Sequence, residues 1–286
     1  MTTIPFFKYH ALGNDYLVID PNRFSILFEL SVPTIQKICH RHYGIGSDGI
    51  LYGPILKTGE IPRVQIFNPD GSEAEKSGNG VRIFSRFMKE MGYVHENFLL
   101  QTLGGVVQVE FLDSTAQMIR VDMGKATFES TKIPVSGPPR QVIQEPITLQ
   151  NQVFQITCLS VGNPHCVIPL TEISEALAKE LGPQLETHPL FPHRINIQLL
   201  KILNRKKIQI EIWERGAGYT LASGSSSCAA AAAAYRLGLI DSSVSVQMPG
   251  GVIQIDQNPK GSILMTGPVT RVAQGEMDLE LLLNSI

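Results

Sequence analysis

Two copies of one sequence pattern occupy the chain, and this internal repeat narrows the possible folds more than any other feature. The first copy opens at Ser77-Gly78 and reaches the segment 104–110 (GGVVQVE), and the second opens at Ser223-Gly224 and reaches 250–256 (GGVIQID). These pairs are offset by 146 residues. Upstream, the segments 13–19 (GNDYLVI) and 162–168 (GNPHCVI) match at an offset of 149 residues, a drift that one loop insertion explains. The recurrence indicates that the two halves are homologous.

Each half predicts the same local structure. An apolar, β-rich run comes first, at residues 64–67 and 208–213, and a Gly-rich polar turn leads from it to the Ser-Gly pair. Helices are predicted over 81–91 and 228–237, each with a glycine near its end that is typical of a helix stop. Alternating strands follow in VVQVEF and VIQIDQ.

The repeat therefore predicts an α+β fold of two homologous domains related by a pseudo-twofold axis, each a β-sheet or barrel around a central helix. We expect the domains to span residues 1–126 and 127–274, with the tail 275–286 as a segment that can pack on the first. The paired Ser-Gly turns then face each other across an interdomain cleft, where we expect the active site. Two helix N-termini in one cleft offer N–H groups and positive partial charge to a carboxylate, such as that of an amino acid.

Composition narrows the classes of function. The chain has 286 residues, a formal net charge of −2, 43% hydrophobic and 17% charged residues, which is typical of globular domains. A nucleic-acid partner is not expected, because the chain contains no long run of Lys and Arg. No apolar run reaches the roughly 18–20 residues that cross a bilayer, and the first residues lack the pattern of a secretory signal. Without such an apolar run we expect no membrane partner. The four cysteines lack C-x-x-C spacing, so we expect a reducing, cytoplasmic location and no metal site.

An ordered set of motifs resembles the diaminopimelate epimerase family, whose wider group includes proline racemase and the phenazine-pathway isomerase. The motifs are HALGNDYLVID, HRHYGIGSDGI, FNPDGSEAEKSGNGVRIF, VGNPHCV, RINI and WERGAGYTLASGSSSCAAA. The resemblance implies an epimerase that needs no cofactor, acts on a small amino acid and converts L,L- to meso-diaminopimelate in the lysine and peptidoglycan pathway. It leaves a homodimer open.

The resemblance also implies how protons move, and here the chain departs from the family pattern. In the family, one cysteine removes the α-proton and an opposite cysteine returns one, whereas the matching positions here are Ser77 and Ser223. A thiol has a pKa of about 8.5, but an alcohol is a far weaker acid and needs a neighbouring base. The resemblance gives His165 and Glu214 as catalytic support, and Tyr219 or Lys76 stays open as a replacement group.

The positions implied to bind substrate carry groups suited to an amino acid. Amide oxygens and a glutamate can accept hydrogen bonds from an ammonium, and an arginine can hold a carboxylate with two hydrogen bonds. Backbone N–H groups of the two Ser-Gly turns suit the α-carboxylate, where charge develops as the α-proton leaves. These positions are Asn14, Asn68, Gly78, Asn79, Asn163, Asn196, Glu214, Arg215, Gly224 and Ser225.

Three functions stay open on these residues. The protein can be an epimerase or racemase whose serines are activated by neighbours. It can instead catalyse a related α-proton abstraction, as a dehydratase or an isomerase, which needs only one strong base. It can also be a relic that binds an amino acid without turning it over.

Overall fold

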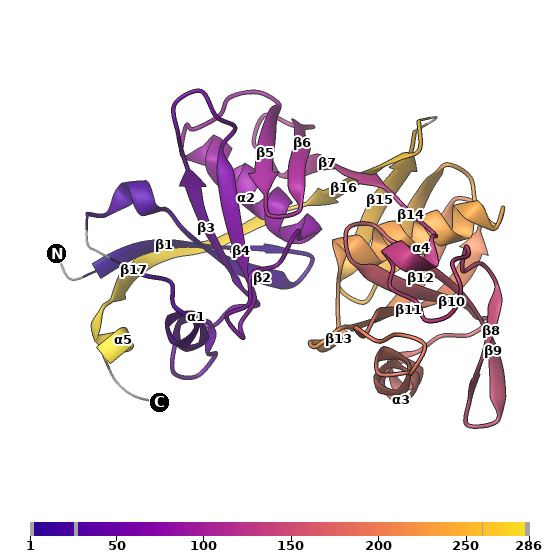
Figure 1. The fold of residues 1–286 in the computed structure, drawn as a ribbon. Helices are drawn as coiled ribbons and strands as arrows, with labels where there is room; N and C mark the ends of the chain where they lie inside the picture. The colour runs from indigo at the N-terminus through magenta and orange to yellow at the C-terminus, as the bar shows by residue number, and fades with distance from the viewer. Residues whose placement is uncertain (1–2, 26–27, 259, 284–286) are drawn as a thin grey trace. The chain divides into compact units, whose positions relative to one another are not determined.

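The computed structural model describes residues 3–25, 28–258 and 260–283, and the chain divides into two compact units. Unit 1 comprises Met1–Val121 and Gly267–Ile286, and unit 2 comprises Asp122–Thr266. Both units are rich in strands and contain few helices (Figure 1), so the predicted α+β class is confirmed. No helix in the described ranges is both long and apolar enough to span a membrane.

Unit 1 is a sheet whose strands run in the order β17-β1-β2-β3-β4-β5-β6-β7. Successive pairs are antiparallel, antiparallel, parallel, antiparallel, parallel, antiparallel and antiparallel. The strands are β1 (Thr3–Ala11), β2 (Asn14–Ile19), β3 (Ile50–Ile55), β4 (Arg63–Phe67), β5 (Phe98–Thr102), β6 (Gly105–Phe111), β7 (Met118–Lys125) and β17 (Thr270–Asp278). The helices are η1 (Pro21–Arg23), α1 (Val32–Cys39), α2 (Gly78–Glu90) and α5 (Glu280–Leu283).

Unit 2 repeats this series of pair directions in the order β8-β9-β10-β11-β12-β14-β15-β16, as the internal repeat predicts. Its strands are β8 (Glu145–Leu149), β9 (Gln152–Ser160), β10 (Pro164–Pro169), β11 (Asn196–Asn204), β12 (Lys207–Glu214), β14 (Ser243–Met248), β15 (Gly251–Gln257) and β16 (Ser262–Pro268). The short β13 (Gly218–Thr220) pairs with β12. The helices are η2 (Ser130–Lys132), α3 (Glu175–Glu186) and α4 (Gly224–Arg236).

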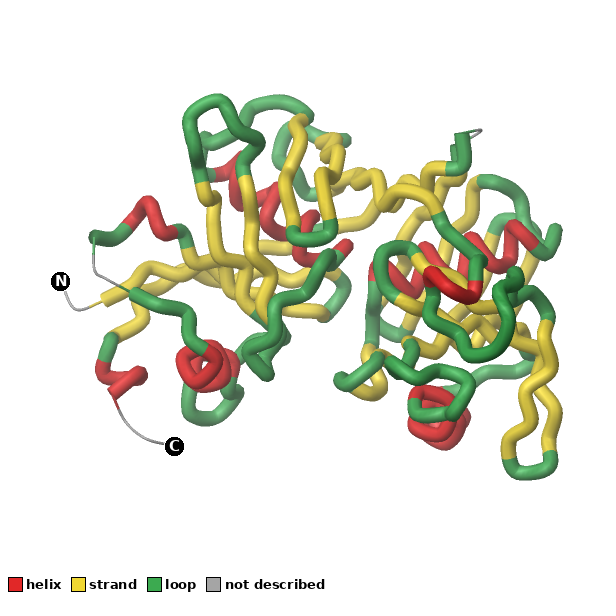
Figure 2. Tube along the Cα trace, in the orientation of Figure 1, coloured by secondary structure: helices red, strands yellow, loops and turns green. Residues whose placement is uncertain are grey.

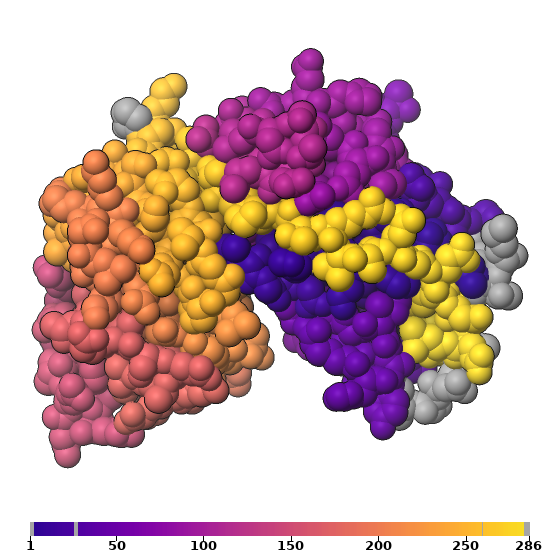
Figure 3. Space-filling view, turned by 180° about the vertical axis from the view of Figure 1, so that it is seen from behind, coloured from indigo at the N-terminus to yellow at the C-terminus, as the bar shows by residue number. Residues whose placement is uncertain are grey.

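The first sheet is completed by the last strand of the chain. β17 pairs antiparallel with β1, with Thr3 opposite Asp278 and His10 opposite Thr270. The yellow C-terminal segment accordingly runs along indigo N-terminal residues on the face drawn in Figure 3. β17 thus takes in unit 1 the place that β8 takes in unit 2.

The two long helices begin earlier than predicted. α2 starts at Gly78 and α4 at Gly224, because the preceding Ser77 and Ser223 are their N-caps and extend each helix upstream of the predicted 81 and 228. Each helix is followed by a glycine with positive φ, 76° at Gly92 and 71° at Gly238. The predicted glycine stops are therefore confirmed.

Both helices are packed against strands over most of their length, as the red segments among yellow strands show (Figure 2). α2 buries large side chains, including Phe84 and Phe87. α4 buries Ala229 to Ala234, none of which is more than 4% exposed. Alanine favours the helix and lets neighbouring strands approach closely, so the sequence of α4 suits a confined helix.

α3 packs against β12 at Gly182, which has no side chain. A Cβ on Gly182 would lie 2.4–2.7 Å from atoms of the Trp213 side chain, which is closer than real contacts allow. The Trp213 indole also donates a hydrogen bond of 2.8 Å to Glu186 at the end of the same helix. Gly182 therefore fixes how near α3 lies to β12.

We expect Gly182→Ala to lower the free energy of unfolding by about 1–3 kcal/mol, because the added methyl group must push the indole aside. Thermal or urea unfolding followed by the fluorescence of Trp213, the chain's single tryptophan, measures this directly. The exposed Glu180 of the same helix supplies the control, since Glu180→Ala adds no atom to the contact. Equal stability of the two variants would show that α3 packs more loosely.

Candidate active site

Ser77 ends the loop before α2 and closes the first turn of that helix. Its backbone is extended, with φ −128° and ψ 118°, and its Oγ accepts a 3.0 Å hydrogen bond from the backbone N–H of Gly80. The phenol oxygen of Tyr16 lies 3.3 Å from the same Oγ. Ser77 is half-buried and Tyr16 is 6% exposed, so this hydroxyl pair lies at the edge of the unit 1 core.

A directional chain of hydrogen bonds orients the asparagines beside Ser77. Asn14 donates to Asp48 at 3.0 Å and accepts from Asn79 at 3.0 Å, and Asn79 accepts from the buried Arg82 at 2.9 Å. Because a carboxylate only accepts and a guanidinium only donates, the two ends of the chain fix which way each amide points. Two predicted binding residues, Asn14 and Asn79, are thereby brought together.

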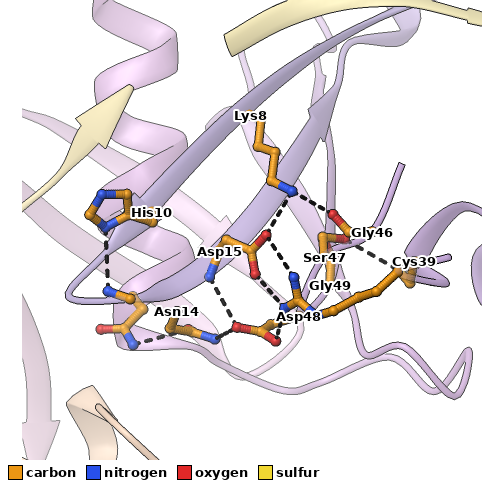
Figure 4. A network of polar contacts seen from close by, with 12 residues as sticks. Lys8, His10, Asn14, Asp15, Cys39, Gly46, Ser47, Asp48 and Gly49 are labelled. Carbon is orange, nitrogen blue, oxygen red and sulfur yellow. Dashed lines mark hydrogen bonds and ion pairs between the residues drawn. The ribbon is translucent and has the colours of Figure 1, made fainter. Parts of the chain in front are cut away.

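Charged side chains hold the Asp48 end of this chain in place (Figure 4). Arg41 lies 2.7 Å from Asp15 and 2.6 Å from Asp48, and Lys8 lies 2.9 Å from Asp15. Burial raises the pKa of the Asp15 carboxyl, but the hydrogen bonds from Arg41 and Lys8 outweigh it and lower that pKa below its ordinary value. Asp15 is therefore a carboxylate at neutral pH.

Asn68 bonds to the turn after β4 and not to this chain of hydrogen bonds. It follows β4, and its side chain donates to the Ser72 hydroxyl at 3.0 Å while its backbone N–H donates to the Ser72 carbonyl at 2.9 Å. The structure thus uses Asn68 to close the turn that leads towards Ser77.

Unit 2 repeats the arrangement around Ser223. Its backbone is again extended, with φ −144° and ψ 124°, and its Oγ accepts from the N–H of Ser226 at 3.3 Å. Asn163 donates to the Ser225 hydroxyl at 3.5 Å, as Asn79 and Asn14 are joined in unit 1. The Ser225 hydroxyl also lies 3.4 Å from that of Ser223. Each unit therefore links a Gly-Asn turn to the first turn of a long helix.

His165 supports Asn163 from inside unit 2. Its side chain is fully buried, and its Nε2 lies 2.9 Å from the Asn163 side-chain oxygen, which can only accept, so Nε2 carries the proton. Burial lowers the pKa of His165 to about 3. The buried Gln198 donates to the Ser226 hydroxyl at 3.0 Å. A neutral His165 in these contacts holds Asn163 in orientation.

The turn that carries Glu214 and Arg215 is fixed by two buried side chains. Asn196 accepts from the N–H of Arg215 at 2.9 Å and donates to the Pro164 carbonyl at 2.8 Å. Glu186 accepts from the N–H of Gly216 at 3.0 Å. Asn196 thus ties this turn to the start of β10, while the Arg215 side chain is exposed and Glu214 is half-buried.

The two open replacement groups differ in their surroundings. The Tyr219 hydroxyl donates to Glu211 at 2.6 Å, and burial together with this hydrogen bond raises the pKa of the phenol well above its ordinary value. Tyr219 is therefore a weaker proton donor than an ordinary tyrosine. Lys76 is half-buried and directly precedes Ser77.

The surroundings of Ser77 in unit 1 and of Ser223 in unit 2 form two half-sites. Sequence reasoning missed four residues that the structure brings to these half-sites. Tyr16 could have been found, because the 149-residue offset aligns it with His165. Arg82 is a charged residue within the segment 81–84 (VRIF), whose other side chains are apolar. Asp48 and Gln198 carry no comparable signal. Within the described ranges, no cluster of three or more His, Cys, Asp or Glu residues could hold a metal ion.

The buried His165 predicts a pH dependence of stability. The unfolded chain binds a proton below a pKa of 6.5, whereas the folded chain does so only near 3, so the free energy of unfolding falls as pH falls between these values. One proton gives a slope of up to about 1.4 kcal/mol per pH unit. Urea unfolding between pH 7 and pH 4.5 should show that His165→Gln removes this slope and that His193→Gln, at an exposed position, keeps it. An unchanged slope in His165→Gln contradicts the burial argument.

Known proteins match the chain over nearly its whole length. The family model for diaminopimelate epimerase matches residues 6–129 and 157–272, and each stretch contains one half-site. Diaminopimelate epimerase 2 of Nostoc sp. (strain PCC 7120) is 54% identical over 277 residues, which cover 96% of each protein. Diaminopimelate epimerase of Moorella thermoacetica is 37% identical over 279 residues, which cover 96% of this chain and 99% of that protein.

Solved structures share the fold at low identity. A probable proline racemase from Agrobacterium radiobacter has a TM-score of 0.71 at 13% identity and covers 96% of this chain and 93% of its own. A methylitaconate-delta-isomerase has a TM-score of 0.64 at 12% identity and covers 100% and 98%. These likenesses confirm the predicted fold. The family match and the relatives show that the chain belongs to the diaminopimelate epimerase family.

Proposed function

We propose that this protein is an epimerase that interconverts L,L- and meso-diaminopimelate without a cofactor, using Ser77 and Ser223 as its two proton-handling groups. The observation that carries the proposal is the matched pair of half-sites. Each unit places a serine hydroxyl at the N-terminus of a packed helix, next to an asparagine from a Gly-Asn turn. An enzyme that takes a proton from one face of a carbon and returns it to the other needs two such groups.

The same half-sites suit the charges of the substrate. The first N–H groups of α2 and α4, at Gly78, Asn79, Gly224 and Ser225, can hold the α-carboxylate where negative charge grows as the proton leaves. Asn14 and Asn163 are oriented by their hydrogen bonds and can contact the amino group. The exposed guanidinium of Arg215 stands on a fixed turn, which suits the distal carboxylate.

We further propose that the protein works in the cytoplasm. Its four cysteines, Cys39, Cys158, Cys166 and Cys228, are free and buried. Free thiols are usual in reducing compartments. An intracellular amino-acid substrate agrees with this location.

The decisive experiment incubates the purified protein with L,L-diaminopimelate in D₂O and follows the α-position by NMR. We expect the α-hydrogen to be replaced by deuterium and the meso form to appear. Release of an altered carbon skeleton from diaminopimelate or from a panel of amino acids would instead identify a dehydratase or isomerase. Saturable binding without exchange would identify a binding relic.

A second experiment tests the positions of the two proton-handling groups. We expect Ser77→Cys with Ser223→Cys to raise the rate of epimerisation at least about tenfold near neutral pH, because a thiol ionises far more readily than an alcohol and each pKa unit changes the ionised fraction tenfold. The matched control is Ser31→Cys with Ser174→Cys, since these serines cap α1 and α3 in the same way. If the first double variant binds diaminopimelate yet exchanges no deuterium, these two positions do not carry the chemistry.

A further inference from the structure

Resting on the proposed function, we propose that Tyr16 is the proton partner of Ser77, and that the two hydroxyls form a relay serving one face of the substrate. The substrate proton passes to the serine oxygen while the serine proton passes to the phenol oxygen. Tyr16 is a positioning and proton-storing residue in this scheme, because it acts through Ser77.

The contacts of the Ser77 oxygen allow the relay to run in both directions. A hydroxyl oxygen has two acceptor positions and one hydrogen. The N–H of Gly80 fills one acceptor position at 3.0 Å, and the Tyr16 hydroxyl lies 3.3 Å from the same oxygen, where either hydroxyl can donate. When Tyr16 donates, the Ser77 hydrogen is left to point at the substrate, and when Tyr16 is a phenolate, Ser77 donates to it and keeps an acceptor position for the substrate proton.

The Tyr16 ring packs on the backbone of Gly49, which has no side chain. A Cβ on Gly49 would lie 2.6 Å from the Tyr16 ring and 2.5 Å from the Phe67 carbonyl, so the ring packs directly on the Gly49 backbone. The carbonyl of Gly49 also accepts from the N–H of Leu17 at 3.1 Å, which locks the loop to β2 beside Tyr16. The same loop carries Asp48 of the charged network (Figure 4). The phenol therefore has a fixed approach to Ser77.

The two units carry different side chains at this point of the repeat. The 149-residue offset aligns Tyr16 on β2 with His165 on β10. In unit 2 the His165 ring is engaged with Asn163 at 2.9 Å, and the hydroxyl nearest Ser223 is the alcohol of Ser225 at 3.4 Å. The phenol contact thus belongs to unit 1, and the two faces of the substrate are served by unequal groups.

The relay balances as a proton transfer. When the Ser77 side removes the α-proton, the Cα–H bond breaks, Ser77 gains that proton and gives its own to a Tyr16 phenolate, and the electron pair stays on the substrate. In the reverse direction, the carbanion takes the Ser77 proton and the serine oxygen takes the phenol proton. A phenol has an ordinary pKa near 10 and is a stronger acid than an alcohol, so the charge rests on Tyr16 and not on Ser77.

The first test needs no substrate turnover, because it reads the acidity of a thiol placed at position 77. In Ser77→Cys, the phenol should stabilise the thiolate, and adding Tyr16→Phe should raise the thiol pKa by about one unit, measured from the pH dependence of alkylation by iodoacetamide. The four native cysteines are buried, which keeps background labelling low. Tyr16→Phe keeps the ring on Gly49 and removes only the hydroxyl.

Tyr9→Phe is the matched control. Tyr9 is directly opposite Tyr16 in the β1–β2 pair, is fully buried, and donates to Glu90 at 2.7 Å. Added to Ser77→Cys, it should leave the thiol pKa unchanged. A thiol pKa that Tyr16→Phe does not move, or that both variants move equally, overturns the proposal whatever reaction the protein catalyses.

The second test uses diaminopimelate in D₂O. In Tyr16→Phe, the isomer whose α-hydrogen meets Ser223 should still exchange it, but reprotonation from the Ser77 side should slow at least about tenfold. Exchange with retention should therefore exceed inversion for that isomer alone, and Tyr9→Phe should keep the wild-type ratio. A wild type that neither exchanges nor inverts refutes the proposed function, and the thiol pKa then decides the Tyr16 contact alone. Normal inversion in Tyr16→Phe refutes the relay.

Discussion

Each unit is organised by one hydrogen bond, in which a serine hydroxyl closes the first turn of a packed helix. The Ser77 bond to Gly80 and the Ser223 bond to Ser226 fix where α2 and α4 begin. The next residues of each helix then present free N–H groups, and the second helical residue bonds to the Gly-Asn turn of a neighbouring strand. The cap therefore fixes where each helix starts and which residue of its first turn meets the Gly-Asn turn.

The two units support their asparagines by different physics. In unit 1, Asn14 and Asn79 lie between a carboxylate and a buried guanidinium, and salt bridges reinforce the outer end. In unit 2, the corresponding support is the neutral His165, which bonds to Asn163. Charged hydrogen bonds are stronger and more directional, whereas neutral ones cost less to bury. The repeat has therefore kept the geometry of the half-site while its chemistry has diverged.

The repeat explains how much of this could be predicted from the sequence. It predicted the α+β class, the strand at 64–67 and its copy at 208–213, and the glycine stops at Gly92 and Gly238, because these depend on local patterns that recur. It placed the helix starts too late, since serine and glycine are poor helix formers and the pattern does not show that Ser77 and Ser223 are caps. Asp48 and Gln198 were missed because their roles depend on contacts between segments distant in sequence. The contact of Tyr16 with Ser77 is of the same kind, although the repeat aligns Tyr16 with His165.

The pairing of β17 with β1 has a consequence for how the chain is made. Unit 2 is continuous in sequence, whereas unit 1 is completed by residues that follow unit 2. β1 emerges early but pairs with β17, which is the last strand to be synthesised in the described chain. Until then one edge of β1 has open N–H and C=O groups, which is the kind of edge that templates association with other chains. The nascent protein therefore carries this open edge during the whole synthesis of unit 2.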